Sequence, residues 1–227
     1  MKICVPVPAR TTSEALQKME EIRPHADMME LRLDRIVEPD LPSLLAAGKA
    51  DIIVTNRHPE EGGGFSGTEE ERVKVLKRAV ELGAGYVDIE MQTEKSLQQE
   101  LLDAVAGCGE HTKVIFSCHN FRGTPSLDEL LDKINCRDCA GRIVKIVTMA
   151  NSMKDNLTML SLLAAVSETG KEIIAFCMGE KGRLSRAAAP LFGSCISYAS
   201  FGKGLESAPG QLTVEEMREI SRLLHAT

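Results

Sequence analysis

The chain has 227 residues and a formal net charge of −6. This acidic balance argues against a nucleic-acid partner or an anionic membrane surface. No stretch approaches the roughly 18 consecutive apolar residues of a membrane span, and the first residues run into an apparent strand without the features of a signal peptide. The seven cysteines are odd in number and irregular in spacing, which suits a reducing compartment, so we expect a cytoplasmic protein.

Short apolar runs recur along the chain, and the segments between them carry helix start signals. Eight runs predict strands, at residues 3–7, 28–34, 52–57, 86–90, 113–119, 143–149, 172–178 and 194–200. Ser/Thr-x-x-Glu capping boxes begin helical segments at Thr11, Thr68, Ser126 and Thr213. Alternating strands and helices predict parallel strands with right-handed crossovers. Eight such units in this length predict an α/β protein with one domain over residues 1–227, a compact (β/α)8 TIM barrel; a doubly wound open sheet is the alternative.

Lys145 lies in the middle of the most apolar run, between Val144 and Ile146. Branched apolar residues on both sides predict a strand that is buried on both faces. Burial in a medium of low dielectric constant disfavours the charged form of an amine, and an uncharged amine attacks ketones. Lys145 is therefore a candidate Schiff-base nucleophile. The alternative is a structural lysine paired with a buried carboxylate, and the strand alone does not decide between them.

Ionisable side chains occupy one face of five predicted strands. Because side chains alternate between faces along a strand, these residues are expected to point into the barrel, where branched apolar residues usually lie. They are Glu30, Arg32, Asp34, Arg57, Asp88, Glu90, His119 and Lys145. Their charges nearly balance, as buried charges must. For Arg32, Asp34 and Asp88 we favour a buried ionic network over a role in the chemistry.

His119 closes the fifth predicted strand, and the active sites of barrel enzymes assemble at the C-terminal ends of strands. It is expected to point to the same side as Lys145 on the next strand, and neighbouring strands lie about 5 Å apart. A histidine at a strand end beside a buried lysine is a candidate general acid/base. Arg57 and Met178 also end their predicted strands. Arg186 follows the seventh strand and could bind a carboxylate with its planar guanidinium.

These residues together resemble type I 3-dehydroquinate dehydratase, the Schiff-base-forming enzyme of the shikimate pathway. The resemblance covers nearly the whole chain and is carried by segments at strand ends and loops, in the order of the family. The segments are Glu30-Leu31-Arg32-Leu33-Asp34, Arg57 with Glu61-Gly62-Gly63, Asp88-Ile89-Glu90, Ser117-Cys118-His119-Asn120-Phe121, Val144-Lys145-Ile146, Met178 with Gly182 and Ser185-Arg186, and Ser207-Ala208-Pro209-Gly210-Gln211.

The resemblance implies a (β/α)8 barrel, usually a homodimer, that dehydrates 3-dehydroquinate to 3-dehydroshikimate on the route to chorismate and the aromatic amino acids, without metal or cofactor. It implies that Lys145 forms the Schiff base, that His119 moves protons and that Glu61 orients His119. Contact with the substrate is implied for Glu30, Arg32, Arg57, Met178, Arg186, Ser207 and Gln211. Among these, Arg186 would bind the carboxylate, and Ser207 and Gln211 would close over the substrate from the last loop.

One departure from the family lies beside the histidine. The family commonly has Asp at the position of Asn120. The change removes a charge next to His119 and could alter its titration, but it touches neither the lysine nor the carboxylate-binding arginine.

Three other functions fit part of the pattern. An imine-forming aldolase acting on sugar phosphates would share Lys145, but it would need a phosphate site after the last two strands, where no clear glycine nest occurs. A metal-dependent barrel lyase could use Glu30, Asp88, Glu90 and His119 as ligands, but neighbouring arginines and the lysine oppose a divalent ion. A non-catalytic binding barrel is least favoured, because both the lysine and the histidine are present.

A lone CxxC pair, Cys136 and Cys139, offers little support for a metal site. Structural zinc needs a second cysteine pair or well-placed histidines, and neither is found nearby. We interpret these cysteines as free thiols.

Overall fold

Short buried strands alternate with helices in the computed structural model, which describes residues 2–48, 51–109, 111–135 and 142–225. The strands are β1 (Lys2–Val7), β2 (Met28–Arg32), β3 (Ile52–Thr55), β4 (Tyr86–Glu90), β5 (Lys113–Asn120), β6 (Ile143–Met149), β7 (Ile173–Met178) and β8 (Ile196–Tyr198). The α-helices are α1 (Thr12–Ile22), α2 (Leu41–Ala46), α3 (Glu69–Glu81), α4 (Lys95–Gly107), α5 (Leu127–Ile134), α6 (Met153–Ser167), α7 (Arg183–Ala188) and α8 (Val214–His225). The 3-10 helices include η1 (Leu33–Arg35), η3 (Pro59–Glu61), η5 (Glu180–Gly182) and η6 (Ala189–Phe192). The CxxC pair lies outside the described residues.

The helix starts predicted from the sequence are capped by side-chain hydrogen bonds in the structure. At α3, Thr68 accepts a hydrogen bond from the backbone N–H of Glu71, and the Glu71 carboxylate accepts one from the N–H of Thr68. The same reciprocal pair precedes α5 and α8. At α1, Thr11 caps the N–H of Glu14, but the Glu14 carboxylate accepts from the N–H of Arg10 instead. These bonds satisfy backbone donors that have no partner inside a helix.

The chain divides into two compact units. The N-terminal unit comprises residues 7–118, and the C-terminal unit comprises residues 1–6 and 119–227. The boundary falls inside β5, so His119 and Asn120 belong to the C-terminal unit. None of the described helices is long and apolar enough to span a membrane.

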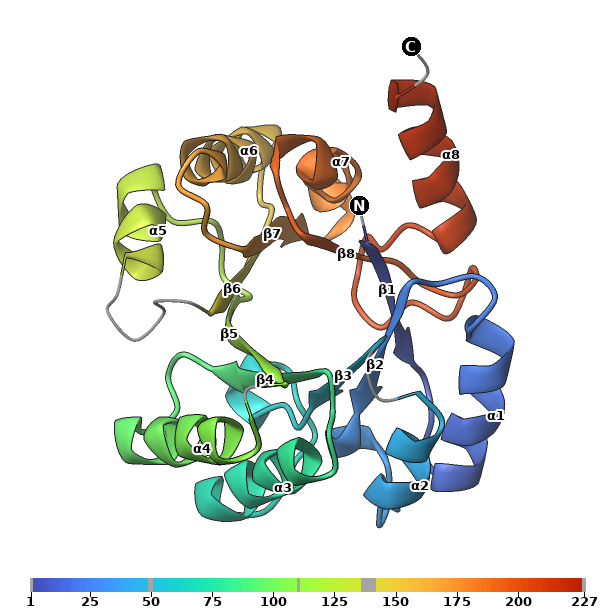
Figure 1. The fold of residues 1–227 in the computed structure, drawn as a ribbon. Coiled ribbons are helices and arrows are strands. Elements are labelled where there is room, and N and C mark those ends of the chain that lie inside the picture. Colours follow the sequence, from blue (N-terminus) through green and yellow to red (C-terminus); the bar gives the residue numbers. More distant parts are fainter. Residues whose placement is uncertain (1, 49–50, 110, 136–141, 226–227) are drawn as a thin grey trace. The chain divides into compact units, whose positions relative to one another are not determined.

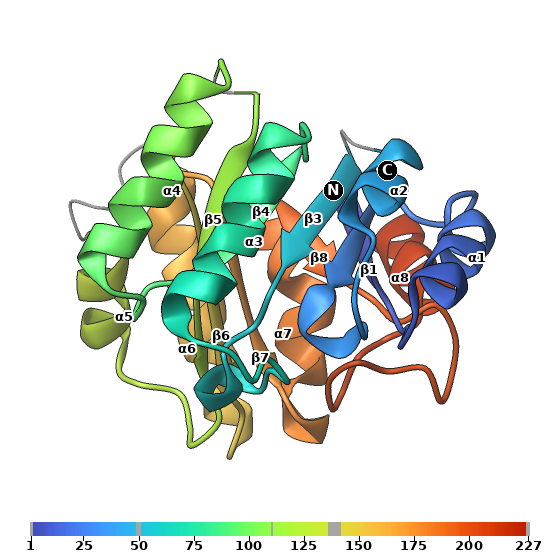
Figure 2. The same cartoon turned by 90° about the horizontal axis from the view of Figure 1, so that it is seen from below.

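In the N-terminal unit, β2, β3, β4 and β5 pair in parallel in that order. The helices α3 and α4 lie side by side, and α3 packs on β3 and β4 (Figures 1 and 2). Every residue of β3 and β4 is buried. Buried charged side chains on β4 therefore need hydrogen-bond or ion-pair partners.

In the C-terminal unit, β6 pairs in parallel with β7 from Val144 opposite Ile173 to Met149 opposite Met178. The short strand β8 pairs with β1, with Tyr198 opposite Cys4. Both α6 and α7 pack on β7 (Figure 1). This packing sets α7 beside β7, and the neighbouring lysine strand is buried along nearly its whole length.

All eight predicted strands are present, and the differences lie at their ends. β2 stops at Arg32 rather than at Asp34, because the chain turns into η1 there. The turn is held by the Asp34 carboxylate, which accepts from the Arg32 guanidinium and from the backbone N–H of Arg57 and Gly64. β3 stops at Thr55, so Arg57 lies beyond its strand, and β8 is reduced to three residues.

Candidate active site

Lys145 is buried in the middle of β6, with only 3% of its surface exposed. Its Nζ donates a hydrogen bond to the phenol oxygen of Tyr198 at 3.0 Å. The same nitrogen lies 4.2 Å from the centroid of the Tyr198 ring. The lysine predicted from the sequence is therefore sheltered, and its nitrogen is held by an aromatic hydroxyl.

Arg186 is the second buried cation of the C-terminal unit, also with 3% of its surface exposed. Its guanidinium lies over the ring of Phe176, 4.5 Å from the centroid. Its Nε has no hydrogen-bond partner among the described residues. Burial lowers the pKa of Arg186 to about 10, against a smaller opposing influence of Cys177. The group is still charged at neutral pH, and no carboxylate in the part of the chain that the structure describes forms an ion pair with it.

The start of α7 is fixed by two buried side chains next to Arg186. Ser185 accepts a hydrogen bond from the backbone N–H of Cys177 at 2.9 Å and donates one to the carbonyl of Gly182 at 2.9 Å. Asn156 on α6 accepts from the N–H of Ser185 at 2.9 Å and donates to the carbonyl of Lys181 at 2.7 Å. These bonds join α6, β7 and α7, so the backbone that carries Arg186 has little freedom.

His119 and Met178 lie at the ends of their strands, as expected. His119 is half-buried and is followed in β5 by Asn120, one residue beyond the predicted strand end. Met178 is buried and is the last residue of β7.

The last loop is anchored to the loop that follows β7. The backbone N–H of Gly179 donates to the carbonyl of Pro209 at 3.0 Å. Gly210 has a φ of 77°, and a Cβ there would collide with the carbonyl oxygen of Gly179. Within the loop, the side-chain oxygen of Gln211 accepts from the N–H of Ser207 at 2.8 Å and from its hydroxyl at 3.3 Å. The predicted loop pair is thus in direct contact.

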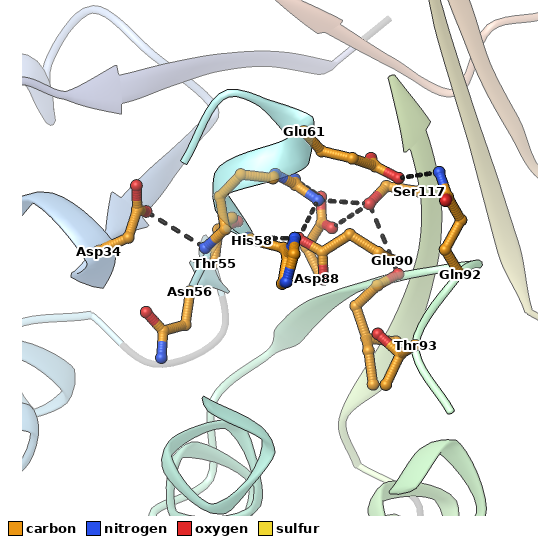
Figure 3. Close-up of polar contacts among 12 residues, drawn as sticks. Asp34, Thr55, Asn56, His58, Glu61, Asp88, Glu90, Gln92, Thr93 and Ser117 are labelled. Atoms are coloured by element: carbon orange, nitrogen blue, oxygen red, sulfur yellow. Dashed lines mark hydrogen bonds and ion pairs between the residues drawn. The ribbon is translucent and has the colours of Figure 1, made fainter. Parts of the chain in front are cut away.

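A buried ionic cluster occupies the N-terminal unit around Arg57. The Arg57 guanidinium pairs with Asp88 at 2.8 Å and with Glu90 at 3.0 Å. Ser117 contacts both Arg57, at 2.5 Å, and Asp88, at 2.6 Å. Figure 3 shows Asp88, Glu90 and Ser117 gathered around these contacts. Burial alone would lower the pKa of Arg57, but the carboxylates of Asp88 and Glu90 raise it well above its ordinary value. The ionic network expected at Asp88 is present.

Arg72 of α3 joins this cluster from the helix layer and was not singled out from the sequence. It is fully buried and pairs with both Glu90 and Glu69. It also donates to the Thr93 hydroxyl at 2.7 Å. Glu90 therefore has a guanidinium on each oxygen, since Arg57 contacts Oε1 and Arg72 contacts Oε2. Its burial could have been predicted from its position, because Arg72 directly precedes Val73, which lies on the apolar face of the predicted helix.

Three other predicted residues lie in the N-terminal unit. Glu30 is buried and accepts a hydrogen bond from the Thr55 hydroxyl at 2.9 Å. Arg32 pairs through two nitrogens with Asp34, at 2.7 and 2.8 Å, so the ion pair expected between them is present. Glu61 is buried in η3 and accepts from the Gln92 amide at 3.2 Å (Figure 3).

A cavity of about 150 Å³ lies beside Glu61. It is lined by His58, Glu60, Glu61, Glu69, Glu90, Gln92 and Thr93. Within the described ranges, no group of three or more His, Cys, Asp or Glu side chains is arranged to hold a metal ion.

The predicted site residues divide between the two units. The C-terminal unit carries the proposed nucleophile, the histidine, Met178, the arginine and the two loop residues. The N-terminal unit carries Glu30, Arg32, Arg57 and Glu61. Tyr198, the partner of Lys145, was missed from the sequence, because nothing local links residues 53 positions apart.

A model of the type I 3-dehydroquinase family matches residues 3–227. The chain belongs to this family. A 3-dehydroquinate dehydratase from Methanocaldococcus jannaschii is 37% identical over 98% of this chain and 98% of its own length. One from Methanothermobacter thermautotrophicus is 39% identical over 96% of this chain and 95% of its own.

Solved structures of the same family superpose on this chain. The 3-dehydroquinate dehydratase of Geobacillus kaustophilus is 27% identical, with a TM-score of 0.88 over 99% of this chain and 91% of that one. A type I enzyme from Clostridium difficile, solved with covalent modified comenic acid, is 24% identical, with a TM-score of 0.89 over 99% and 92% of the two chains. The predicted (β/α)8 fold class is confirmed, and so is the enzyme class, a lyase of the shikimate pathway and a type I 3-dehydroquinate dehydratase.

Proposed function

We propose that this chain dehydrates 3-dehydroquinate through an imine on Lys145, with His119 as the general base and then the general acid. Family membership supports the reaction. The observation that carries the site is Arg186, a buried guanidinium whose Nε has no hydrogen-bond partner in the described segments of the chain. The substrate carboxylate would supply the missing anion, and the planar fork of arginine suits a carboxylate better than an ammonium does.

The proposed chemistry needs one amine and one proton carrier. The Lys145 Nζ attacks the C3 ketone, and loss of water gives a protonated imine. This cation withdraws electrons from C2, so His119 can remove the C2 proton and leave an enamine. The enamine expels the C1 hydroxyl, which takes the proton back from His119 and departs as water. Hydrolysis of the imine then frees Lys145, and the net change is the loss of one water molecule.

The buried position of Lys145 supports its part in this sequence. Lys145 is buried in a strand of branched apolar residues, so its stem has little freedom to leave the strand. The Clostridium difficile relative, described with covalent modified comenic acid, is a precedent for covalent chemistry in the family.

Other assignments come from the resemblance and stay predictions. They are contact with the substrate by Glu30, Arg32, Arg57, Met178, Ser207 and Gln211, and orientation of His119 by Glu61. We also propose that residues 1–227 act as one catalytic domain, without metal or cofactor, as a cytoplasmic homodimer.

Borohydride reduction in the presence of 3-dehydroquinate tests the mechanism. The hydride would convert the imine to a secondary amine, and mass spectrometry of the digested protein should find the adduct on the peptide that contains Lys145. Lys145→Ala should lose both the adduct and activity. Lys113→Ala, at the exposed start of β5, is the matched control and should retain both. Turnover that continues in borohydride without any adduct would reject the imine.

His119→Ala separates the two chemical steps. The variant should still form the imine, because the attack on the ketone uses Lys145, but elimination should fall by about 10²–10⁴-fold, the usual contribution of general acid–base catalysis. We expect borohydride to trap the adduct on this variant while the formation of 3-dehydroshikimate is nearly lost. Wild-type elimination in this variant would remove His119 from its role.

A further inference from the structure

We infer that Tyr198 is a further catalytic residue, which holds the reacting nitrogen of Lys145 and stabilises its cationic forms. The inference rests on the proposed imine mechanism. Tyr198 is not among the site residues that the resemblance to the family implies. Two contacts carry it, the hydrogen bond of 3.0 Å from Nζ to the phenol oxygen and the distance of 4.2 Å from Nζ to the ring centroid.

The hydroxyl of Tyr198 can accompany the nitrogen through each stage of the reaction. An ammonium or an amine can donate to the phenol oxygen, and a neutral amine can also accept the phenol proton. A protonated imine keeps one N–H, which can still donate to that oxygen. Tyr198 thus offers a partner to every protonation state that Lys145 passes through.

The ring of Tyr198 makes a separate contribution. An aromatic face attracts a cation within about 6 Å, and the attraction is stronger where water is excluded. Tyr198 and Lys145 are both buried. The positive charge of the protonated imine would remain on the same nitrogen, so the ring favours the intermediate from which C2 loses its proton.

The position of Tyr198 is fixed by its surroundings. It is the last residue of β8 and pairs with Cys4 of β1. Its ring also packs against Phe176, at a centroid distance of 6.0 Å and an interplanar angle of 49°. A hydroxyl held this firmly fixes the end of a long, flexible lysine side chain, and preorganisation of this kind lowers the cost of reaching the reactive geometry.

Tyr198→Phe tests the hydroxyl while keeping the ring. In single turnovers, its borohydride-trapped adduct should form about tenfold more slowly than in the wild type, which corresponds to about 1.4 kcal/mol. Affinity for quinate, which has the carboxylate but no ketone, should not change. Tyr198→Leu also removes the ring and should slow the adduct further. A purely structural tyrosine would either affect quinate binding as well or leave the adduct rate alone.

Tyr86→Phe is the matched control, because Tyr86 and Tyr198 are the only tyrosines. Tyr86 is buried in β4 of the other unit, and its variant should trap the adduct at the wild-type rate. The chain has no tryptophan. In Tyr86→Phe protein, Tyr198 is therefore the only source of the tyrosine band. After the absorption of the substrate, the product and the conjugated imine is subtracted, this band should change as the imine forms.

The outcomes separate this inference from the proposed function. If wild-type protein forms no adduct, the imine mechanism fails. If wild-type protein forms it and Tyr198→Phe forms it equally fast, the role of Tyr198 is wrong while the mechanism holds. Should Tyr198→Phe fail to fold, the spectrum of Tyr86→Phe decides, and an unchanged tyrosine band during imine formation overturns the inference.

Discussion

Arg57 and Arg186 are both buried arginines, and their surroundings move their pKa values in opposite directions. Arg57 has the carboxylates of Asp88 and Glu90 within 3.0 Å, which more than offset burial and raise its pKa. Arg186 lies over the ring of Phe176, its Nε has no partner within the described ranges, and burial lowers its pKa to about 10. The first arginine is satisfied by the protein itself, and we propose that the substrate carboxylate completes the contacts of the second.

Arg186→Met should therefore raise the stability of the ligand-free protein and impair catalysis. Removing a buried charge with an incomplete set of partners should add about 1–3 kcal/mol to the free energy of unfolding. The KM for 3-dehydroquinate should rise at least tenfold, because the carboxylate loses its charge-assisted hydrogen bonds. In the wild type, that affinity should fall as the pH rises through about 10 and Arg186 loses its proton.

Urea unfolding and steady-state kinetics measure the two effects of this substitution. Arg183→Met is the control, since Arg183 lies on the same helix with 44% of its side chain exposed and a distant partner, Glu216, at 4.0 Å. It should change the unfolding free energy by less than about 1 kcal/mol. An Arg186→Met protein that is less stable than the wild type would show that the guanidinium is satisfied without substrate.

A functional residue can be predicted from the sequence when its polarity or charge differs sharply from that of its neighbours. Lys145 could be predicted because one ammonium among branched apolar residues is visible in the sequence. The assignment of Arg186 needed the resemblance to a family, because an arginine after a strand is ordinary by itself. Tyr198 could not be predicted as a partner, since its contact with Lys145 depends on the three-dimensional placement of β6 and β8.

At the scale of elements, α3 is tied to β4 by a charge rather than by apolar packing alone. Arg72 reaches from the helix to Glu90, whose other oxygen contacts Arg57. Removing one member of a buried ionic group typically costs about 3–5 kcal/mol, because the remaining charge stays buried without compensation. We expect Arg72→Ala to lower the unfolding free energy by this amount.

Arg78→Ala provides a comparison within the same helix. Arg78 pairs with Glu81 at 2.8 Å, but both side chains are more than half exposed. Exposed pairs contribute about 0–1 kcal/mol, so denaturant unfolding should distinguish the two variants clearly. Equal costs for Arg72→Ala and Arg78→Ala would mean that the cluster is not needed to hold α3 in place.

The order and type of the strands could be predicted because the apolar runs and capping boxes are local features. The end of β2 could not, because it depends on distant groups. Asp34 continues the alternating pattern of its strand, yet its carboxylate binds backbone N–H groups of Arg57 and Gly64 and turns the chain into η1. Burial alone would raise the pKa of Asp34, but Arg32 and these N–H groups lower it.

At the scale of the whole molecule, the proposed single domain has a direct test in the two tyrosines. Tyr86 belongs to the N-terminal unit and Tyr198 to the C-terminal unit. In Tyr198→Phe and Tyr86→Phe proteins, the tyrosine signal during urea unfolding reports on one unit each. One cooperative domain predicts that each signal coincides with the loss of helical circular dichroism in the same variant. Transitions that separate within a variant would show that the units unfold independently.

The close approach of Gly210 to Gly179 limits how the substrate range of this enzyme can be redesigned. A combinatorial library that randomises the last loop would lose most members at position 210, where any side chain meets the Gly179 carbonyl. Ser207 and Gln211 are free of that restriction, and neither has a positive φ. Such a library should therefore vary these two positions and keep Pro209 and Gly210 unchanged, because they hold the loop in place.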